Sequence, residues 1–271
     1  MNASSTFTAV DGDGYEQTMG RWSRRLAPQF LAFAGCRDGE RVLDLGCGTG
    51  ALGVALLQAC NPARVQGVDF SPEYVAHARR AHTDARLAFR VGDACALDEA
   101  DASYDRVLAL LVLHFVPRTA DAVAEMRRVA RPGAVVAAAV WDARGGFVAN
   151  RVFWDTAASL DPVGGGAARA RNYTRPLTRP GELAAAWRAA GLREVQDTQL
   201  VVRMDFASFA DYWGPYVGRE GPGAQYVAGL DAEARGRLEA AVRAAYLDGE
   251  PDGPRSYAAL AWAVRGVAPT A

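Results

Sequence analysis

The sequence predicts an α/β fold in which a doubly wound, mostly parallel sheet is covered by helices on both faces. Strand-like and helix-like segments alternate from residue 41 onward. The strand-like segments are apolar throughout, which is typical of strands that are buried on both faces. A glycine-rich turn, with Gly46, Gly48 and Gly50, follows the first of these segments. Such turns between a strand and a helix commonly bind a ligand.

The first half of the chain is expected to supply five strands and the helices between them. One helix should follow the glycine turn, and the next should begin after Ser71, because Ser is a common N-cap and Pro72 then occupies the first helical position. The expected strands are Arg41–Leu45, Arg64–Asp69, Arg86–Val91, Tyr104–Leu110 and Ala134–Trp141, and the helices are Ala51–Cys60, a segment ending near His82, and Asp121–Ala130.

The second half is less regular, and we interpret it as a completion of the sheet with a helical insertion at about residues 205–250. Its expected elements are a helix at Phe147–Leu160, a long connection at Asp161–Pro180, a helix at Gly181–Ala190, a strand at Leu192–Met204 and a closing strand at Tyr257–Gly266. Before residue 41, Tyr15–Phe33 is expected to form one or two helices. We therefore divide the chain into an N-terminal helical lid, residues 1–40, and a main domain, residues 41–271.

The composition argues against several classes of partner and site. The 271 residues carry a formal charge of −1, and all thirty basic residues are arginine. This balance gives no electrostatic footprint for nucleic acid or for a membrane surface. The four cysteines form no CxxC pair and have no histidine at ligand spacing, so neither a metal site nor a disulfide framework is expected. We expect a cytoplasmic protein, because the N-terminus lacks a signal-peptide pattern and the longest apolar run is too short for a bilayer. The sequence does not indicate an oligomeric state.

The stretch RVLDLGCGTG, residues 41–50, is compatible with two kinds of ligand. A dinucleotide would place its pyrophosphate at the N-terminus of the following helix. S-adenosylmethionine (SAM) would instead bring a cationic ammonium group and a cationic sulfonium. Asp44 favours SAM, because a carboxylate repels a pyrophosphate and attracts an ammonium. Bare glycines at Gly46, Gly48 and Gly50 would let the methionyl part lie against the backbone.

Two further acids follow the next two expected strands. Asp69 ends the second strand, where a carboxylate can accept hydrogen bonds from both ribose hydroxyls of NAD or of SAM. Phe70 follows it and is a candidate for stacking on adenine. Asp93, after the third strand, is a candidate acceptor for the adenine amino group, and Ala94 can supply a backbone N–H to a ring nitrogen. Together with Asp44, these positions predict a SAM site.

The motifs LDLGCGTG, GVDFSPEYV, VGDA, YDRVLALLVLHFV and MRRVARPGAVV occur in this order between about Arg41 and Trp141. The set resembles the class I SAM-dependent methyltransferases, although ARPGA stands where that family often has LRPGG. The resemblance implies a Rossmann-like, seven-stranded sheet whose last strand is antiparallel, and SYAALAWAVRG is similar to that closing strand. It also implies that Leu110 lies near the transferable methyl group.

The upstream stretch YEQTMGRWSRRLAP resembles the N-terminal segment of a bacterial subgroup that has the same word, MGRWSR. The resemblance implies that this segment folds over the cofactor. Tyr15, Arg21 and Trp22 are therefore candidate cofactor contacts, with Arg21 as a partner for the carboxylate of SAM.

Methyl transfer from a sulfonium is an in-line displacement, so the protein mainly aligns the nucleophile and excludes water. A base helps where the nucleophile is a hydroxyl or a protonated amine. His114, after the fourth strand, and Asp142, after the fifth, are the candidate catalytic residues. Trp141, Trp154 and Tyr173 are candidates for an aromatic acceptor pocket.

The sequence thus predicts SAM-dependent methylation of an oxygen or nitrogen on a small molecule, in a setting such as specialised metabolism. Three alternatives remain open. SAM could be cyclised to azetidine-2-carboxylate with release of methylthioadenosine, the chain could bind SAM without catalysis, or it could be an NAD-dependent dehydrogenase. The last would lack the Tyr-x-x-x-Lys pair of many dehydrogenases, because the chain has no lysine.

Overall fold

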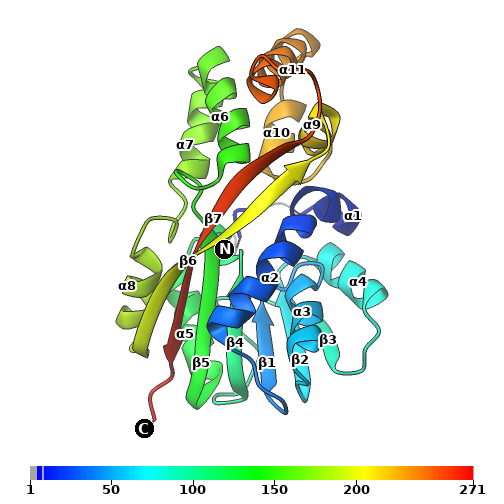
Figure 1. Ribbon diagram of the computed structural model, residues 1–271. Helices are drawn as coiled ribbons and strands as arrows, with labels where there is room; N and C mark the ends of the chain where they lie inside the picture. The colour runs from blue at the N-terminus through cyan, green and yellow to red at the C-terminus, as the bar shows by residue number, and fades with distance from the viewer. Residues whose placement is uncertain (1–4, 8, 271) are drawn as a thin grey trace.

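The computed structural model describes residues 5–7 and 9–270, and its centre is a seven-stranded sheet (Figure 1). The strands lie in the order β3-β2-β1-β4-β5-β7-β6, and only β7 runs antiparallel to its two neighbours. The predicted Rossmann-like fold with an antiparallel last strand is confirmed. The strands are β1 (Arg41–Leu45), β2 (Arg64–Asp69), β3 (Leu87–Val91), β4 (Tyr104–Leu110), β5 (Ala130–Trp141), β6 (Arg193–Phe206) and β7 (Arg255–Val267).

Helices cover both faces of this sheet, as the apolar strands require. The side chains of β1 and β4 are buried on both sides, and they separate two hydrophobic clusters. One cluster receives α2 (Arg21–Ala34) and α3 (Ala51–Ala59), and the other receives α5 (Thr119–Val129) and α8 (Glu182–Ala189). α4 (Pro72–Ala81) packs on β2 and β3, and its N-terminus is capped by Ser71, as predicted.

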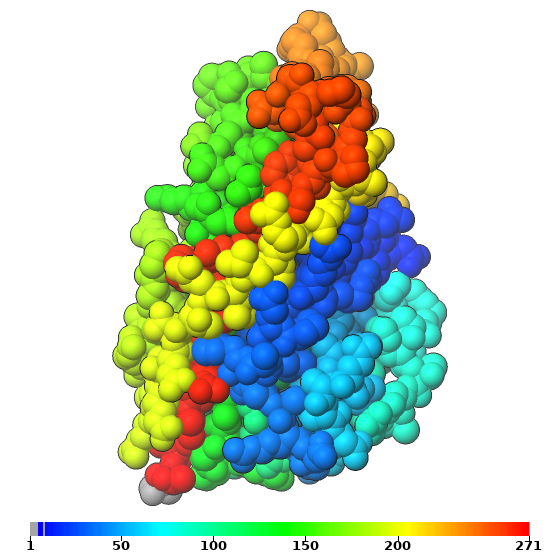
Figure 2. All heavy atoms as spheres, in the orientation of Figure 1, coloured from blue at the N-terminus to red at the C-terminus, as the bar shows by residue number. Residues whose placement is uncertain are grey.

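The N-terminal segment lies across the carboxyl edge of the sheet. It contains α1 (Gly12–Tyr15), the short π-helix η1 (Glu16–Gly20) and α2. Figure 2 shows this segment in blue, between the cyan first half of the sheet and the yellow and orange C-terminal elements. Residues 1–4 and 8 of the expected lid lie outside the described residues.

The remaining helices gather at one end of the molecule, above the carboxyl edge (Figure 1). α6 (Val148–Leu160) and α7 (Gly164–Tyr173) follow β5, whereas α9 (Phe209–Val217), α10 (Gly221–Ala228) and α11 (Ala232–Leu247) connect β6 to β7. β7 pairs with β5 only from Ala261 to Val267, and beyond that point β6 and β7 continue as a two-stranded ribbon. This ribbon carries the inserted helices away from the sheet.

The prediction of a long connection over residues 161–180 is wrong for its first part, which forms α7. The glycine run at its start suggested a turn, but Gly164 and Gly165 donate their N–H groups to the Asp161 carboxylate, which caps the helix. A Cβ on Gly165 would lie 2.4 Å from the carbonyl oxygen of Ala157 on α6. Glycine at this position therefore lets α7 approach α6 closely.

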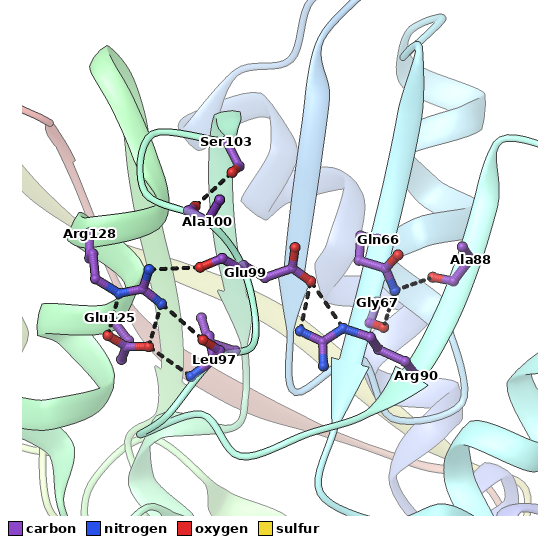
Figure 3. A network of polar contacts seen from close by, with 10 residues as sticks. All are labelled: Gln66, Gly67, Ala88, Arg90, Leu97, Glu99, Ala100, Ser103, Glu125 and Arg128. Atoms are coloured by element: carbon purple, nitrogen blue, oxygen red, sulfur yellow. Dashed lines mark hydrogen bonds and ion pairs between the residues drawn. The ribbon is translucent and has the colours of Figure 1, made fainter.

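Ion pairs hold the loop that follows β3. On α5, Arg128 donates hydrogen bonds to the carbonyl oxygens of Leu97 and Glu99, and Glu125 aligns its guanidinium (Figure 3). The Glu99 carboxylate in turn binds Arg90 on β3. These contacts fix the middle of the loop between β3 and β4.

Candidate functional site

A cavity of about 550 Å³ lies at the carboxyl edge of the sheet. One wall is formed where the parallel strands end, at Leu45 and Gly46, Asp69, Leu110 and Trp141. The opposite wall comes from the N-terminal segment and from the helices above the sheet. In open parallel sheets, ligands bind in this position, next to the point where the strand order reverses; here that point lies between β1 and β4.

The glycine turn has the backbone shape that the sequence suggests. Gly46, Gly48 and Gly50 have φ angles of 71°, 53° and 97°, in the left-handed region that favours glycine. A Cβ on Gly46 would lie 2.3 Å from Val112, so packing also requires glycine there. Gly46 and Gly48 line the cavity, whereas Gly50 lies behind it, against His82.

Asp44 is a buried carboxylate whose two oxygens have no hydrogen-bond partner among the described residues. Burial, and to a lesser extent the charge of Asp69, raises the pKa of Asp44 from 3.8 to about 7. Asp44 itself lies just behind the wall, and its neighbours Leu45 and Gly46 line the cavity. A buried, unpaired acid of this kind is costly, and a cationic ligand would satisfy it.

Asp69 lines the cavity and is held in place by the backbone. Its Oδ2 accepts from the N–H of Gly48 at 2.8 Å, and its Oδ1 accepts from the N–H of Ser71 at 2.9 Å. Burial raises its pKa, while these N–H groups lower it. Each carboxylate oxygen can accept more than one hydrogen bond, so the fixed oxygens can still receive a diol.

The other expected adenosine contacts are divided between the wall and its surroundings. Phe70 lines the cavity and is half exposed, as an open stacking surface would be, and Ala94 lines it as well. Asp93 is not among the lining residues. It accepts from the N–H of Cys95 at 2.8 Å and lies 3.5 Å from Arg118.

The end of β4 carries backbone strain next to the cavity. Leu110 lines the cavity, as does Leu111, which has a φ of 62° although it is not glycine. Strained residues of this kind often occur at functional sites. The short 3₁₀-helix η2 (Leu113–Phe115) follows and places His114 in the wall.

The three candidates from the N-terminal segment all line the cavity. Tyr15 is partly buried near the two strand-end acids; desolvation, with smaller contributions from Asp69 and Asp44, raises its pKa to about 12. Trp22 packs edge-on against Phe206. Arg21 does not present a free guanidinium, because its Nη1 lies 2.8 Å from Asp211 of α9. The expected role of Arg21 would require this ion pair to be shared with a ligand.

The two candidate catalytic residues lie in different surroundings. His114 is buried in the wall, and its Nδ1 has no partner in the described part of the chain. Burial, and then the charge of Arg175, lowers the pKa of His114 to about 3, so the imidazole is neutral at pH 7. Asp142 is not among the lining residues. Its Oδ1 accepts from the N–H groups of Arg144 and Gly145, so it stabilises the turn after β5.

Part of the chain matches a known protein family. Residues 42–133, from β1 to the beginning of β5, match a family model described as "Methyltransferase domain". These residues form a methyltransferase domain. The match includes the glycine turn and the ends of β2, β3 and β4, where the cavity-lining residues of the first wall lie.

Several relatives share this methyltransferase domain. Erythromycin 3''-O-methyltransferase of Saccharopolyspora erythraea is 38% identical over 120 residues, which are 42% of this chain and 39% of that protein. The 27-O-demethylrifamycin SV methyltransferase of Amycolatopsis mediterranei is 34% identical over 125 residues, 45% of this chain and 46% of that protein. The chain thus spans less than half the length of these curated relatives.

Among solved structures, the phosphoethanolamine N-methyltransferase 2 of Haemonchus contortus in complex with S-adenosyl-L-methionine is similar in fold. The TM-score is 0.57 at 16% identity, and the match covers 97% of this chain and 61% of that one. The likeness therefore extends over the methyltransferase domain and also over the second half of the chain.

Of the three residues predicted for an aromatic acceptor pocket, one lines the main cavity. Trp141 lines the cavity. Trp154 is not among its lining residues and instead contributes to an adjoining cavity of about 520 Å³. Tyr173 lines neither cavity and donates its O–H to Asp155 at 3.2 Å.

Glu220 and Arg175 line the methyltransferase cavity but are not among the site residues predicted from the sequence. Glu220, at the N-terminus of α10, accepts from the backbone N–H groups of Val10 and Asp11 and from the O–H of Tyr74. It thereby ties the N-terminal segment to α4 and to the inserted helices. Arg175 lies between α7 and α8 and lines both cavities. In the sequence, nothing distinguishes Glu220 or Arg175 from the many acids and arginines of exposed loops.

Proposed function

We propose that this chain transfers the methyl group of SAM to an oxygen or nitrogen of a small-molecule acceptor. The observation that carries the proposal is the unpaired, buried carboxylate of Asp44 beside the glycine turn, directly behind the wall of a cavity of about 550 Å³. The relatives named as O-methyltransferases of erythromycin and rifamycin intermediates support an acceptor of this class.

The residues present fit SAM. Asp44 would receive the ammonium group, because a cation is what its two unpaired oxygens lack. Asp69 would accept the ribose hydroxyls, and Phe70 and Ala94 would contact the adenine. When bound, SAM supplies a methyl group on a sulfonium, and the S–CH₃ bonding pair leaves with sulfur as the nucleophile's lone pair forms the new bond.

The chain's own contribution to the reaction is alignment and exclusion of water. Leu110 and Leu111 line the cavity at the end of β4, and the acceptor would lie in the part of the cavity that the cofactor leaves free. Trp22 and the other N-terminal residues close the cavity from above. The neutral imidazole of His114 would accept a hydrogen bond from an acceptor O–H or N–H and so orient its lone pair.

Titration calorimetry with SAM tests the cofactor part of the proposal. The wild type should bind SAM, and Asp44→Asn should bind it at least about tenfold more weakly, because a charge-assisted hydrogen bond is lost. Asp197→Asn is the matched control, since Asp197 is an exposed acid on β6 far from the cavity lining. Absence of binding to the folded wild type would refute the proposal.

The transfer itself is tested by incubating the protein with SAM and a panel of hydroxyl- and amine-bearing acceptors. S-adenosylhomocysteine should form only when an acceptor is present, and the acceptor should gain one methyl group by mass spectrometry. Release of methylthioadenosine without an acceptor would contradict methyl transfer.

A further inference from the structure

Arg175 is a partly buried arginine that has no acidic partner among the described residues. Its Nη2 donates to Oδ1 of Asn172 at 3.1 Å, and its guanidinium carbon lies 4.2 Å from the ring centroid of Phe115. Neither neighbour is charged. Burial lowers the pKa of Arg175 to about 10, with no compensating contribution from any acid, so the group remains a cation at pH 7. By contrast, Arg169 on the preceding helix is paired with Asp155 at 2.9 Å.

The charged residues around Arg175 are mainly positive. It forms part of the partition between the main cavity and the adjoining cavity of about 520 Å³. The described residues that line the adjoining cavity include Arg171 and Arg175 but no aspartate or glutamate. The acids of the main cavity, Asp69, Glu73 and Glu220, belong to its cofactor end and to the lid contacts. An anion at the Arg175 end would therefore meet attraction without a competing carboxylate.

Much of the remaining lining of the main cavity is apolar. Phe115 packs against Arg175, and Trp141, Phe147, Met204 and Phe206 line the same cavity. Asn150, on α6, also lines it, and its side chain makes no hydrogen bond within the described residues. The walls thus suit an apolar, partly aromatic body with a single charged end.

We propose that the acceptor carries a carboxylate, which Arg175 binds while the apolar walls hold the remainder of the molecule. This proposal rests on the proposed methyltransferase function and names its substrate class. A guanidinium can donate two parallel N–H bonds to a carboxylate, which supplies the charge that Arg175 lacks in its low-dielectric site. One guanidinium balances one negative charge, so a monoanion fits better than a phosphate monoester.

Matched pairs of small probes test the proposal by calorimetry in the presence of S-adenosylhomocysteine. The probes are octanoate with octanamide, cinnamate with cinnamamide, and phenyl phosphate. For the wild type, at least one carboxylate should bind about tenfold or more tightly than its amide. Arg175→Gln should remove this preference. Arg175→Lys should retain part of it, since lysine keeps the positive charge but lacks the two parallel N–H donors of a guanidinium.

Two more variants separate the charge of Arg175 from general effects. Arg179→Gln removes the same charge from an exposed position that lines neither cavity, and this variant should bind the carboxylates as the wild type does. Asn172→Asp places a carboxylate within reach of Arg175 and should abolish carboxylate binding while Arg175 is still present. Thermal unfolding and SAM affinity show that each variant is folded.

Equal binding of carboxylate and amide by the wild type, including no binding of either, would overturn the proposal. So would an unchanged preference in Arg175→Gln, or tighter binding of phenyl phosphate than of both carboxylates. These outcomes are distinct from a failure of the methyltransferase function. Carboxylate binding can be measured without SAM, and a protein that binds carboxylates but not SAM would refute the cofactor assignment alone.

Discussion

Replacement of Asp44 by asparagine should have opposite effects on stability and on cofactor binding. In the free protein, the carboxylate is buried without a partner, and its pKa is raised to about 7. Asparagine has nearly the same shape and no charge. The variant should therefore be more stable than the wild type at pH 8 and should bind SAM less tightly.

The size of the stability effect follows from the pKa. The rise from 3.8 to about 7 corresponds to about 4 kcal/mol against the ionised form in the folded protein, at about 1.4 kcal/mol per pKa unit. Between these two values the native Asp44 holds a proton that the unfolded chain has lost, so stability falls as the pH rises from about 4 to about 7. The amide has its own unmet hydrogen bonds, which lowers the expected gain at pH 8 to about 1–3 kcal/mol.

Urea unfolding of the two proteins at pH 8 and pH 5 measures this effect, with calorimetry for SAM. The stability difference should be largest at pH 8 and should shrink at pH 5, where the wild-type acid is also neutral. SAM affinity at pH 8 should fall by about 10- to 100-fold, as expected for a charge-assisted bond worth about 1.5–3 kcal/mol. An asparagine variant that is less stable at pH 8 and binds SAM as the wild type does would refute the reasoning.

Three further predictions concern Asp69, His114 and Glu220. Asp69→Ala should weaken SAM binding by about tenfold or more and should also lower the melting temperature, because two backbone N–H groups lose their acceptor; wild-type affinity by calorimetry would contradict the ribose contact. The folded-state pKa of His114 is lowered from 6.5 to about 3, so the unfolded chain takes up its proton first and the wild type should lose up to about 2 kcal/mol between pH 7 and pH 5. In urea unfolding, His114→Asn should lack this contribution to the loss of stability between pH 7 and pH 5. If the variant and the wild type lost the same stability over this range, His114 would not be the cause. Glu220→Ala should speed hydrogen exchange of the Val10 amide, which would lose its acceptor; unchanged exchange would show that the N-terminal segment is held by other contacts.

The sequence was sufficient for the sheet and for the cofactor end of the cavity. Acids such as Asp44 and Asp69 can be recognised in the sequence because they interrupt or end an otherwise apolar strand. Parallel strands also bring their carboxyl ends to one edge of the sheet, so these acids are expected to lie near one another. The predicted fold class is confirmed by the strand order. The cofactor contacts at these positions remain proposals, which the variants above would test.

The acceptor end was not predictable to the same degree. Arg175 is one of several arginines in a segment that reads as a solvated loop, and only the folded chain shows that it lacks a partner. Asp142 stands at a strand's carboxyl end in sequence, but the local turn directs its carboxylate to backbone N–H groups. The surroundings of Arg175 and of Asp142 are set by loop geometry and by contacts between distant segments. Neither of these two factors produces a periodic pattern in the sequence.

Within residues 5–7 and 9–270, every helix is too short or too polar to traverse a bilayer.

The ribbon formed by the outer parts of β6 and β7 has a practical consequence for engineering. Residues 207–254 connect the two strands at the outer end of this ribbon. Replacing them with the corresponding segment of a related enzyme would therefore leave every strand pairing of the sheet intact. The exchanged piece would nevertheless include Asp211 and Glu220, which fasten Arg21 and the backbone at Val10. A chimera intended to accept a new molecule should therefore keep these two acids, because without them the N-terminal segment would lose its contacts with the inserted helices.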